Sequence, residues 1–302
     1  MAACSLIYSS NDREKQISID KDEFARVSLA LEIDRTQLTI EEKYHILLEN
    51  YQELEEELLR FSLKLTLHSP DPWETLRDAT PLFDRRVLNF LSSARMYLDQ
   101  IPSDISIASR NPESVLADFE KSRSGHYDQT LGYRVCEALR NYTQHKSLPV
   151  HGVTYGWRHG QEDADAKVVN YSGLKLNLSR LEADGKFKST TLEELRLLGD
   201  NYDLKRFLRE YMHCLGEVHI NLRKNLQGDG EWAIEEIRQM RARILSLPDA
   251  QPDGHISLAV VDDDGQQERK GGLTTIRYNR RKFMQAGSRR SPSLVQIQLS
   301  SE

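Results

Sequence analysis

The sequence predicts a mainly α-helical protein whose short β-strands are confined to one insertion and to the C-terminal part. Apolar residues recur at three- and four-residue spacing over long stretches, as in amphipathic helices. Charged residues make up 29% of the chain, which indicates an extensive solvated surface. Strand-like alternation occurs only near 150–182 and beyond 248. With 302 residues the chain can form one large domain or two smaller ones.

A long acidic helix is predicted in the N-terminal part. Residues 1–15 are polar, and we expect them to be loose. Thr39-Ile40-Glu41-Glu42 fits a capping box, which predicts a helix start. Apolar residues then follow a 4-3-4-3 spacing that forms a narrow seam: Ile40, Tyr44, Leu47, Tyr51, Leu54, Leu58, Phe61 and Leu65. The seam must pack against another helix, and a hairpin within the chain is favoured over a second copy.

Shorter helices are predicted between residues 84 and 247. Pro70, Pro72 and Pro81 indicate a connecting loop before them. Gly228-Asp229-Gly230 is expected to separate the last two helices, and Thr190 with Glu193 forms a second capping box. Apolar stripes and capping residues place the helices at 84–101, from Asn111-Pro112 to about 124, 127–145, from 190, 201–226 and 232–247.

Two segments read as strands. Two or three short strands are expected near 150–182, inserted in the helical region. Beyond Pro248, three more are predicted at HISLAVV, LTTIRYNRRKF and LVQIQLS, with Asp264-Gly265 in a tight hairpin turn. We therefore expect three parts, which are an acidic helical region at 1–80, a helical domain at 81–248 and a basic β-rich appendage at 249–302.

Charge is distributed unevenly, although the net charge is only −6. Residues 41–57 hold seven glutamates against one lysine. The segment 269–290 has no acid and holds Arg269, Lys270, Arg277, Arg280, Arg281, Lys282, Arg289 and Arg290. Solvated surfaces explain both segments. The alternatives are that the basic segment touches nucleic-acid phosphate or associates with the acidic helix.

Several classes of protein lack support in the sequence. No run approaches the roughly 18 apolar residues of a membrane span, and no secretory signal is expected. The cysteines, Cys4, Cys136 and Cys214, are too scattered for a disulfide framework or a zinc knuckle, so a reducing cytoplasm is expected. Motifs for phosphate loops, dinucleotides, zinc proteases and serine hydrolases are absent. His151 and His159 lack a third ligand, so neither a metal nor another cofactor is expected.

The residues best suited to chemistry form the cluster LRNYTQHK at 139–146, at the end of a predicted helix. A guanidinium can clamp a phosphate and stabilise its growing charge. An imidazole, whose unperturbed pKa is about 6.5, can move protons to and from the oxygens of an RNA chain. Arginine with histidine therefore suits RNA cleavage without a metal. The polar residues of the cluster are Arg140, Asn141, Gln144, His145 and Lys146.

Arg140, Asn141 and His145 resemble the signature of HEPN-family ribonucleases, in which Arg is followed by a polar residue, often Asn, and after a short spacer by His. The helix expected at 84–101 is similar to the first core helix of such domains. The resemblance covers about 82–150, at most to 247. It implies a helical bundle that dimerises, so that two motifs form one metal-independent endoribonuclease site. It also implies toxin–antitoxin or antiviral defence, with an antitoxin or a companion defence protein as a further partner.

A second pair, Arg206 and His213, has similar spacing, but Phe207 follows this arginine and is the wrong chemistry for that position. Arg140 and His145 are therefore favoured. On a straight helix their five-residue step turns the two side chains about 140° apart. They converge on one phosphate only if the helix end loosens or a second subunit contributes, which predicts a homodimer.

The leading expectation is a HEPN-type endoribonuclease that leaves a 2′,3′-cyclic phosphate. Arg140 would hold phosphate, His145 would act as general acid or base, and Asn141 would position the motif. The alternatives are a non-catalytic HEPN-like module that binds nucleic acid or a partner protein, and a helical protein that mediates assembly. Further RNA contacts that add affinity are expected from Gln144, Lys146, Arg277, Arg280, Arg281 and Lys282.

Overall fold

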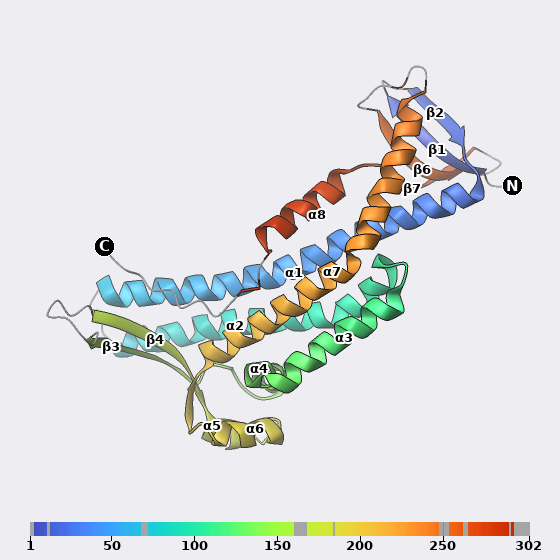
Figure 1. Cartoon of the computed structure of the whole chain (residues 1–302). Coiled ribbons are helices and arrows are strands. Elements are labelled where there is room, and N and C mark those ends of the chain that lie inside the picture. Colours follow the sequence, from blue (N-terminus) through green and yellow to red (C-terminus); the bar gives the residue numbers. More distant parts are fainter. Residues whose placement is uncertain are drawn as a thin grey trace. The chain divides into compact units, whose positions relative to one another are not determined.

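The computed structural model describes residues 3–10, 13–67, 72–159, 168–183, 185–247, 250, 254–261, 265–289 and 291–292. The chain is mainly helical with small antiparallel sheets (Figure 1), which confirms the predicted fold class at that level. It divides into two compact units. Unit 1 comprises Met1–Lys43, Gln100–Phe119 and Asn221–Arg289, and unit 2 comprises Tyr44–Asp99, Glu120–Ile220 and Arg290–Glu302.

Three long helices contribute residues to both units: α1 (Lys21–Leu67), α2 (Pro72–Ala108) and α7 (Leu204–Leu245). The shorter helices are α3 (Pro112–Gln129), α4 (Leu131–His145), α5 (Leu178–Ala183), α6 (Ser189–Arg196) and α8 (Ile276–Gly287). None of the described helices has a stretch that is both long and apolar enough to cross a lipid bilayer. The predicted division into parts at 1–80, 81–248 and 249–302 has other bounds than these two units and stays a prediction.

Unit 1 contains a four-stranded antiparallel sheet in the order β2-β1-β6-β7. Its strands are β1 (Ala3–Ser10), β2 (Arg13–Ser18), β6 (His255–Val261) and β7 (Gln267–Gly272). Leu6 lies opposite Leu258, and both belong to a core that includes Val27 of α1 and Ile237 of α7. The expectation that residues 1–15 are loose was therefore wrong for the described part, because burial of apolar side chains offsets the cost of ordering them.

The C-terminal part was only partly predicted. HISLAVV forms β6, but it pairs with β7, a strand that was not predicted, instead of with LTTIRYNRRKF. In the expected turn, Gly265 has a φ of +79° and Asp264 lies outside the described residues. The strand expected at LTTIRYNRRKF was wrong, since this segment contains α8, and LVQIQLS lies outside the described residues. The helix places Arg277, Arg281 and Gln285 on one side, where they contact α1. Partners far away in the sequence therefore override the local strand pattern.

Unit 2 is built on the apolar seam of α1, which packs against α2. The rings of Phe61 and Phe83 are 5.4 Å apart, and those of Tyr51 and Phe90 are 5.6 Å apart. This confirms the predicted helical hairpin within the chain. The α2 helix runs through Pro81 and extends beyond both ends of the predicted 84–101 segment.

The β-insertion is confirmed for two strands, whereas the third strand of its sheet lies at 201–203, outside the predicted 150–182 and in a segment predicted as helix. The sheet is three-stranded and antiparallel, in the order β3-β4-β5, with Leu174 and Leu176 buried on it. The α3 helix begins at Pro112 as expected and continues to Gln129, past the predicted end. The strands are β3 (Gly152–His159), β4 (Val168–Asn177) and β5 (Asn201–Asp203).

Both predicted capping boxes were wrong. Thr39 lies inside α1, and its hydroxyl donates to the carbonyl of Arg35 at 3.2 Å. The start of α1 is instead capped by Asp20, whose Oδ1 accepts from the backbone N–H of Glu23 at 2.7 Å. The α6 helix begins at Ser189, one residue before the predicted cap, and no side chain caps it.

The glycines at 228 and 230 do not break α7. Asp229 between them accepts from the Ser109 hydroxyl at 2.6 Å and from Nε of Arg110 at 2.7 Å, so α7 is joined to the end of α2 and the turn that follows. Burial works against ionisation of Asp229, but these donors lower its pKa overall. A Cβ at Gly230 would lie 2.9 Å from Nη2 of Arg281. A side chain at this position would push against the ends of Gln37 and Arg281, which are both buried.

Candidate functional site

The candidate site lies at the C-terminal end of α4 in unit 2. The apolar face of this helix is buried, with Val135, Cys136 and Leu139 fully covered. Tyr142 is also buried, and its ring lies 6.1 Å from that of Phe187. This packing fixes the helix and turns its remaining residues outward. The outward residues carry the predicted chemistry.

The structure presents the predicted polar cluster on the surface. Asn141, Gln144, His145 and Lys146 are exposed, and Arg140 is half-buried. Nη1 of Arg140 donates to Oδ1 of Asn141 at 3.1 Å, which orients the guanidinium. No hydrogen bond joins the His145 side chain to the residues that the structure describes. Asn141 and His145 are four residues apart and share one face of the helix.

The last turn of α4 remains regular. The backbone N–H of Lys146 donates to the carbonyl of Tyr142 at 2.9 Å, so the helical spacing continues to the end of the motif. The five-residue step therefore keeps Arg140 and His145 about 140° apart within one chain. The helix end therefore does not loosen to bring the two side chains together.

A buried carboxylate holds the loop that follows the motif. Oδ1 of Asp84 on α2 accepts from the backbone N–H of Val150 at 2.9 Å. Asp84 is only 3% exposed, and burial raises the pKa of its carboxyl while the Val150 N–H opposes that rise. The next residue, His151, donates its N–H to the carbonyl of Lys175 on β4 at 2.8 Å. Two anchors therefore fix the chain just beyond the motif.

Arg140 differs from neighbouring arginines of unit 2 in its partners. Arg134 donates to both carboxylate oxygens of Glu194, at 2.9 and 2.5 Å. Arg209 forms a two-point ion pair with Glu55, with both distances 2.7 Å. Among the described residues, Arg140 forms no ion pair with a carboxylate. No carboxylate of the described residues therefore offsets the charge of its guanidinium.

The second pair of the same kind is engaged within unit 2. Nε of Arg206 donates to Glu210 at 3.0 Å. Nδ1 of His213 hydrogen bonds with the Ser291 hydroxyl at 2.9 Å, and this hydroxyl also lies 2.8 Å from the His213 carbonyl. Both side chains therefore contact other residues of unit 2, whereas Arg140 has no carboxylate partner and His145 no side-chain hydrogen bond among the described residues.

The four basic residues expected to bind RNA on α8 fall into two groups. Arg277 donates to Asp34 at 3.1 Å, and Arg281 is 3% exposed. Burial lowers the pKa of Arg281 and raises that of Asp34. Arg280 and Lys282 are exposed, although Arg280 lies 3.4 Å from a carboxylate oxygen of Glu42. Contact of Arg277 or Arg281 with phosphate would require α8 to leave α1.

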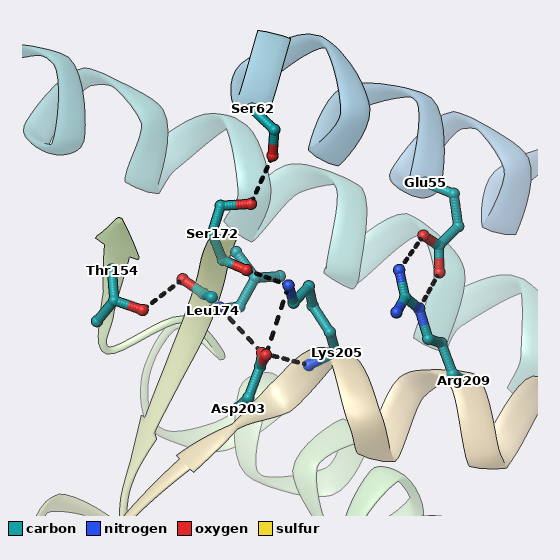
Figure 2. A network of polar contacts seen from close by, with 9 residues as sticks. Glu55, Ser62, Thr154, Ser172, Leu174, Asp203, Lys205 and Arg209 are labelled. Carbon is teal, nitrogen blue, oxygen red and sulfur yellow. Dashed lines mark hydrogen bonds and ion pairs between the residues drawn. The ribbon is translucent and has the colours of Figure 1, made fainter. Parts of the chain in front are cut away.

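Sequence reasoning missed a polar network at the start of α7. Figure 2 shows Lys205 directed toward Asp203 and the backbone of Ser172, with Lys205 Nζ 3.4 Å from the Asp203 carboxylate. Asp203 also accepts from the N–H of Leu174 at 3.2 Å, and the Ser172 hydroxyl lies 2.8 Å from that of Ser62 on α1. The network joins β4, β5, α1 and α7 and serves the fold. No local pattern marks it, because its members are far apart in the sequence.

The described residues form no site arranged for metal binding or for thiol chemistry. No group of three His, Cys, Asp or Glu side chains is placed to hold a metal ion within those residues. Nδ1 of His151 accepts from the N–H of Asn177 at 2.9 Å, and the His159 side chain lies outside the description. Cys136 and Cys214 are buried, and burial raises the pKa of both thiols. A reactive thiolate is disfavoured at both.

Comparison of the chain with protein-family models, curated proteins and solved structures gives no match. The chemistry of the α4 end is therefore the basis for a functional assignment.

Proposed function

We propose that the protein is a metal-independent endoribonuclease of the HEPN type, acting as a toxin or an antiviral defence effector. Its active site is formed by the α4 ends of two copies of the chain. An antitoxin or a companion defence protein controls the activity. The observation that carries the proposal is an arginine without a carboxylate partner among the described residues, five positions before an exposed histidine on one rigid helix.

In the proposed reaction, Arg140 binds the scissile phosphate and stabilises the charge that grows on its oxygens. His145 accepts the proton of the adjacent 2′-hydroxyl as that oxygen attacks the phosphorus. The bond between phosphorus and the 5′-oxygen breaks, and the imidazolium returns the proton to that oxygen. The products are a 2′,3′-cyclic phosphate and a 5′-hydroxyl.

The remaining residues of the cluster support this chemistry. Asn141 holds the guanidinium of Arg140 through its Oδ1 at 3.1 Å, which makes it a positioning residue. Gln144 and Lys146 are exposed next to His145 and supply further contacts to the RNA backbone. The anchored loop after the motif keeps these groups in a fixed arrangement, as a preorganised site requires.

The direct test is incubation of the purified protein with end-labelled RNA in excess EDTA. We expect discrete fragments that carry a 2′,3′-cyclic phosphate, and we expect a 2′-deoxy substitution at a cut position to block that cut. His145→Ala should lower the cleavage rate by on the order of 10²–10⁴-fold. Arg140→Ala should be comparably damaging, and Arg140→Lys should rescue poorly because an ammonium lacks the planar fork.

Arg206→Ala and His213→Ala are the matched controls, since this pair has similar spacing but is engaged inside the protein. Full activity of all four alanine variants would contradict the proposal. Loss of activity only in the two controls would place the site on α7 instead.

A second candidate function is a non-catalytic module that binds nucleic acid or a partner protein. The divergence of Arg140 and His145 on a regular helix favours it, because a single copy does not bring the two groups to one phosphate. Binding of RNA without cleavage, under every metal and companion condition tested, would select this candidate.

A further inference from the structure

The α8 helix of unit 1 has two chemically different sides. Its inner side is polar and is held by α1. Arg277 contacts Asp34, Arg281 contacts Gln37, and Nε2 of Gln285 donates to Glu41 at 2.9 Å. These inner residues recur every four positions, so one row of side chains attaches the helix. The other side therefore points away from α1.

The outer side combines apolar and basic residues. Phe283 is 81% exposed and Ile276 is 72% exposed, although both are large apolar side chains. Arg280 and Lys282 are exposed beside them. The helix contains no acidic residue. An exposed aromatic ring between cations is not required by the packing of unit 1.

Cations also gather around one ring at the junction of α8 and α7. Arg238 of α7 and Arg281 each lie 5.3 Å from the centre of the Tyr278 ring, and Lys282 lies 5.4 Å from it. Among the residues described, neither Arg238 nor Lys282 forms an ion pair with a carboxylate. Positive charge therefore collects around this ring, and an anion bound beside it would offset the charges of Arg238 and Lys282. The sequence pattern of α8 did not reveal Arg238, which comes from a different helix.

We propose that this surface, formed by Arg238, Tyr278, Arg280, Lys282 and Phe283, binds single-stranded nucleic acid. Arg238 and Lys282 contact successive phosphates, and a base stacks on the exposed ring of Phe283. Base stacking on aromatic side chains beside a positively charged groove is the usual basis of single-strand binding. The proposal goes beyond the α4 site and does not require the chain to cleave RNA.

The chemistry favours a single strand over other partners. A duplex keeps its bases stacked on one another, so it offers phosphates but no free base face to Phe283. A membrane surface requires a broad apolar face, whereas the outer side of α8 offers only two large apolar residues among polar ones. A protein partner would leave the cluster of cations around Tyr278 unused unless it were strongly acidic.

The test is fluorescence anisotropy of a labelled single-stranded oligodeoxynucleotide of about 12 nucleotides, titrated with the full chain at several salt concentrations. DNA is used because it lacks the 2′-hydroxyl, so cleavage cannot disturb the measurement. Phe283→Ala should weaken binding roughly tenfold without changing its salt dependence. It should leave the binding of a duplex of equal length unchanged, and Phe283→Trp should retain binding.

Neutralisation of two cations tests the phosphate contacts. Arg238→Gln with Lys282→Gln should weaken binding and reduce the slope of log affinity against log salt by about 1.4, which is about 0.7 for each of two phosphates. The matched control is Arg26→Gln with Arg243→Gln, which removes the same charge from exposed ion pairs of unit 1 with Glu236 and Glu23. This control should change the slope much less.

Three outcomes would overturn the proposal. One is an absence of oligonucleotide binding by the parent protein. Another is an equal change of the salt slope in the two double variants, which would mean that binding depends on the overall charge and not on this surface. The third is binding to vesicles containing phosphatidylserine that Phe283→Ala abolishes while oligonucleotide binding stays unchanged, which would assign the surface to a lipid.

Discussion

Arg209 on α7 and Glu55 on α1 form a two-point ion pair, with Nε to Oε1 and Nη2 to Oε2 both at 2.7 Å. Their side chains are 22% and 15% exposed, so water screens the pair only partly. The Tyr51 hydroxyl also donates to Oε1 of Glu55 at 2.9 Å. This pair joins two helices of unit 2 close to the β-insertion, as Figure 2 shows.

Removal of one partner of this pair should be costly. Arg209→Ala leaves Glu55 largely buried without a counter-charge, and we expect a loss of about 3 kcal/mol in the free energy of unfolding. Arg206→Ala is the control, because Arg206 is 76% exposed in its pair with Glu210 and should cost less than about 1 kcal/mol. Urea unfolding followed by circular dichroism measures both. Equal losses for the two variants would contradict the assigned role of the pair.

Alanine substitutions at Gly228 and Gly230 of α7 should change the stability of the protein in opposite directions. Gly230→Ala places a Cβ against Gln37 and 2.9 Å from Nη2 of Arg281, so it should destabilise unit 1 and increase proteolysis of α8. Two residues earlier in the same helix, a Cβ added at Gly228 would have no atom within 4 Å. Gly228→Ala should stabilise the helix by up to about 1 kcal/mol. Thermal melting and limited proteolysis distinguish the two, and a destabilising Gly228→Ala would argue against a continuous α7.

The buried carboxyl of Asp84 should make stability depend on pH. Its pKa is raised in the folded protein by burial, so the folded state favours the protonated form. The stability this contributes is fully present below the ordinary carboxyl pKa of about 4 and is lost as pH rises through the raised pKa. Asp84→Asn keeps an acceptor for the Val150 N–H without a charge. It should therefore be more stable than the parent at neutral pH, and the difference should shrink toward pH 4 in urea unfolding.

Subunit mixing tests the composite active site. If Arg140 of one copy acts with His145 of the other, a dimer of one Arg140→Ala chain and one His145→Ala chain retains one of the two symmetry-related Arg140–His145 combinations in the composite site. Random mixing makes half of the dimers mixed, so about one quarter of the parent activity should return. Each variant alone should stay inactive. An absence of recovery, with subunit exchange verified by mass spectrometry, would place both groups in the same copy.

Prediction from sequence succeeded where the determining contacts are local or periodic. The seam from Ile40 to Leu65 predicted a helical hairpin, and Asn111 with Pro112 predicted the start of α3. Alternation of apolar residues at Leu174 and Leu176 predicted the inserted strands. In these cases the residues that decide the structure are neighbours along the chain.

Prediction failed where partners lie far away in the sequence. The continuity of α7 across Gly228 and Gly230 rests on contacts of Asp229 with Ser109 and Arg110. The helical state of α8 rests on Asp34 and Glu41, and the ordering of β1 rests on β6. The sequence shows the motif at 140–145 as a pattern. It does not show that Arg140 lacks a carboxylate partner among the described residues. Arg238 beside Tyr278 was equally hidden, because it comes from another helix.

The pairing of β1 with β6 has a consequence for how the chain folds during synthesis. Leu6 and its partner Leu258 are separated by a long stretch of sequence, so they can pair only after the intervening residues have been synthesised. Most residues of unit 2, at 44–99 and 120–220, lie between these strands in the sequence, so they can collapse before β1 pairs with β6. Such distant pairing is slow, because a long loop must close before its contacts contribute. Until then the strand at 3–10 exposes an unpaired edge, and a chaperone that shields it would raise the yield of folded protein.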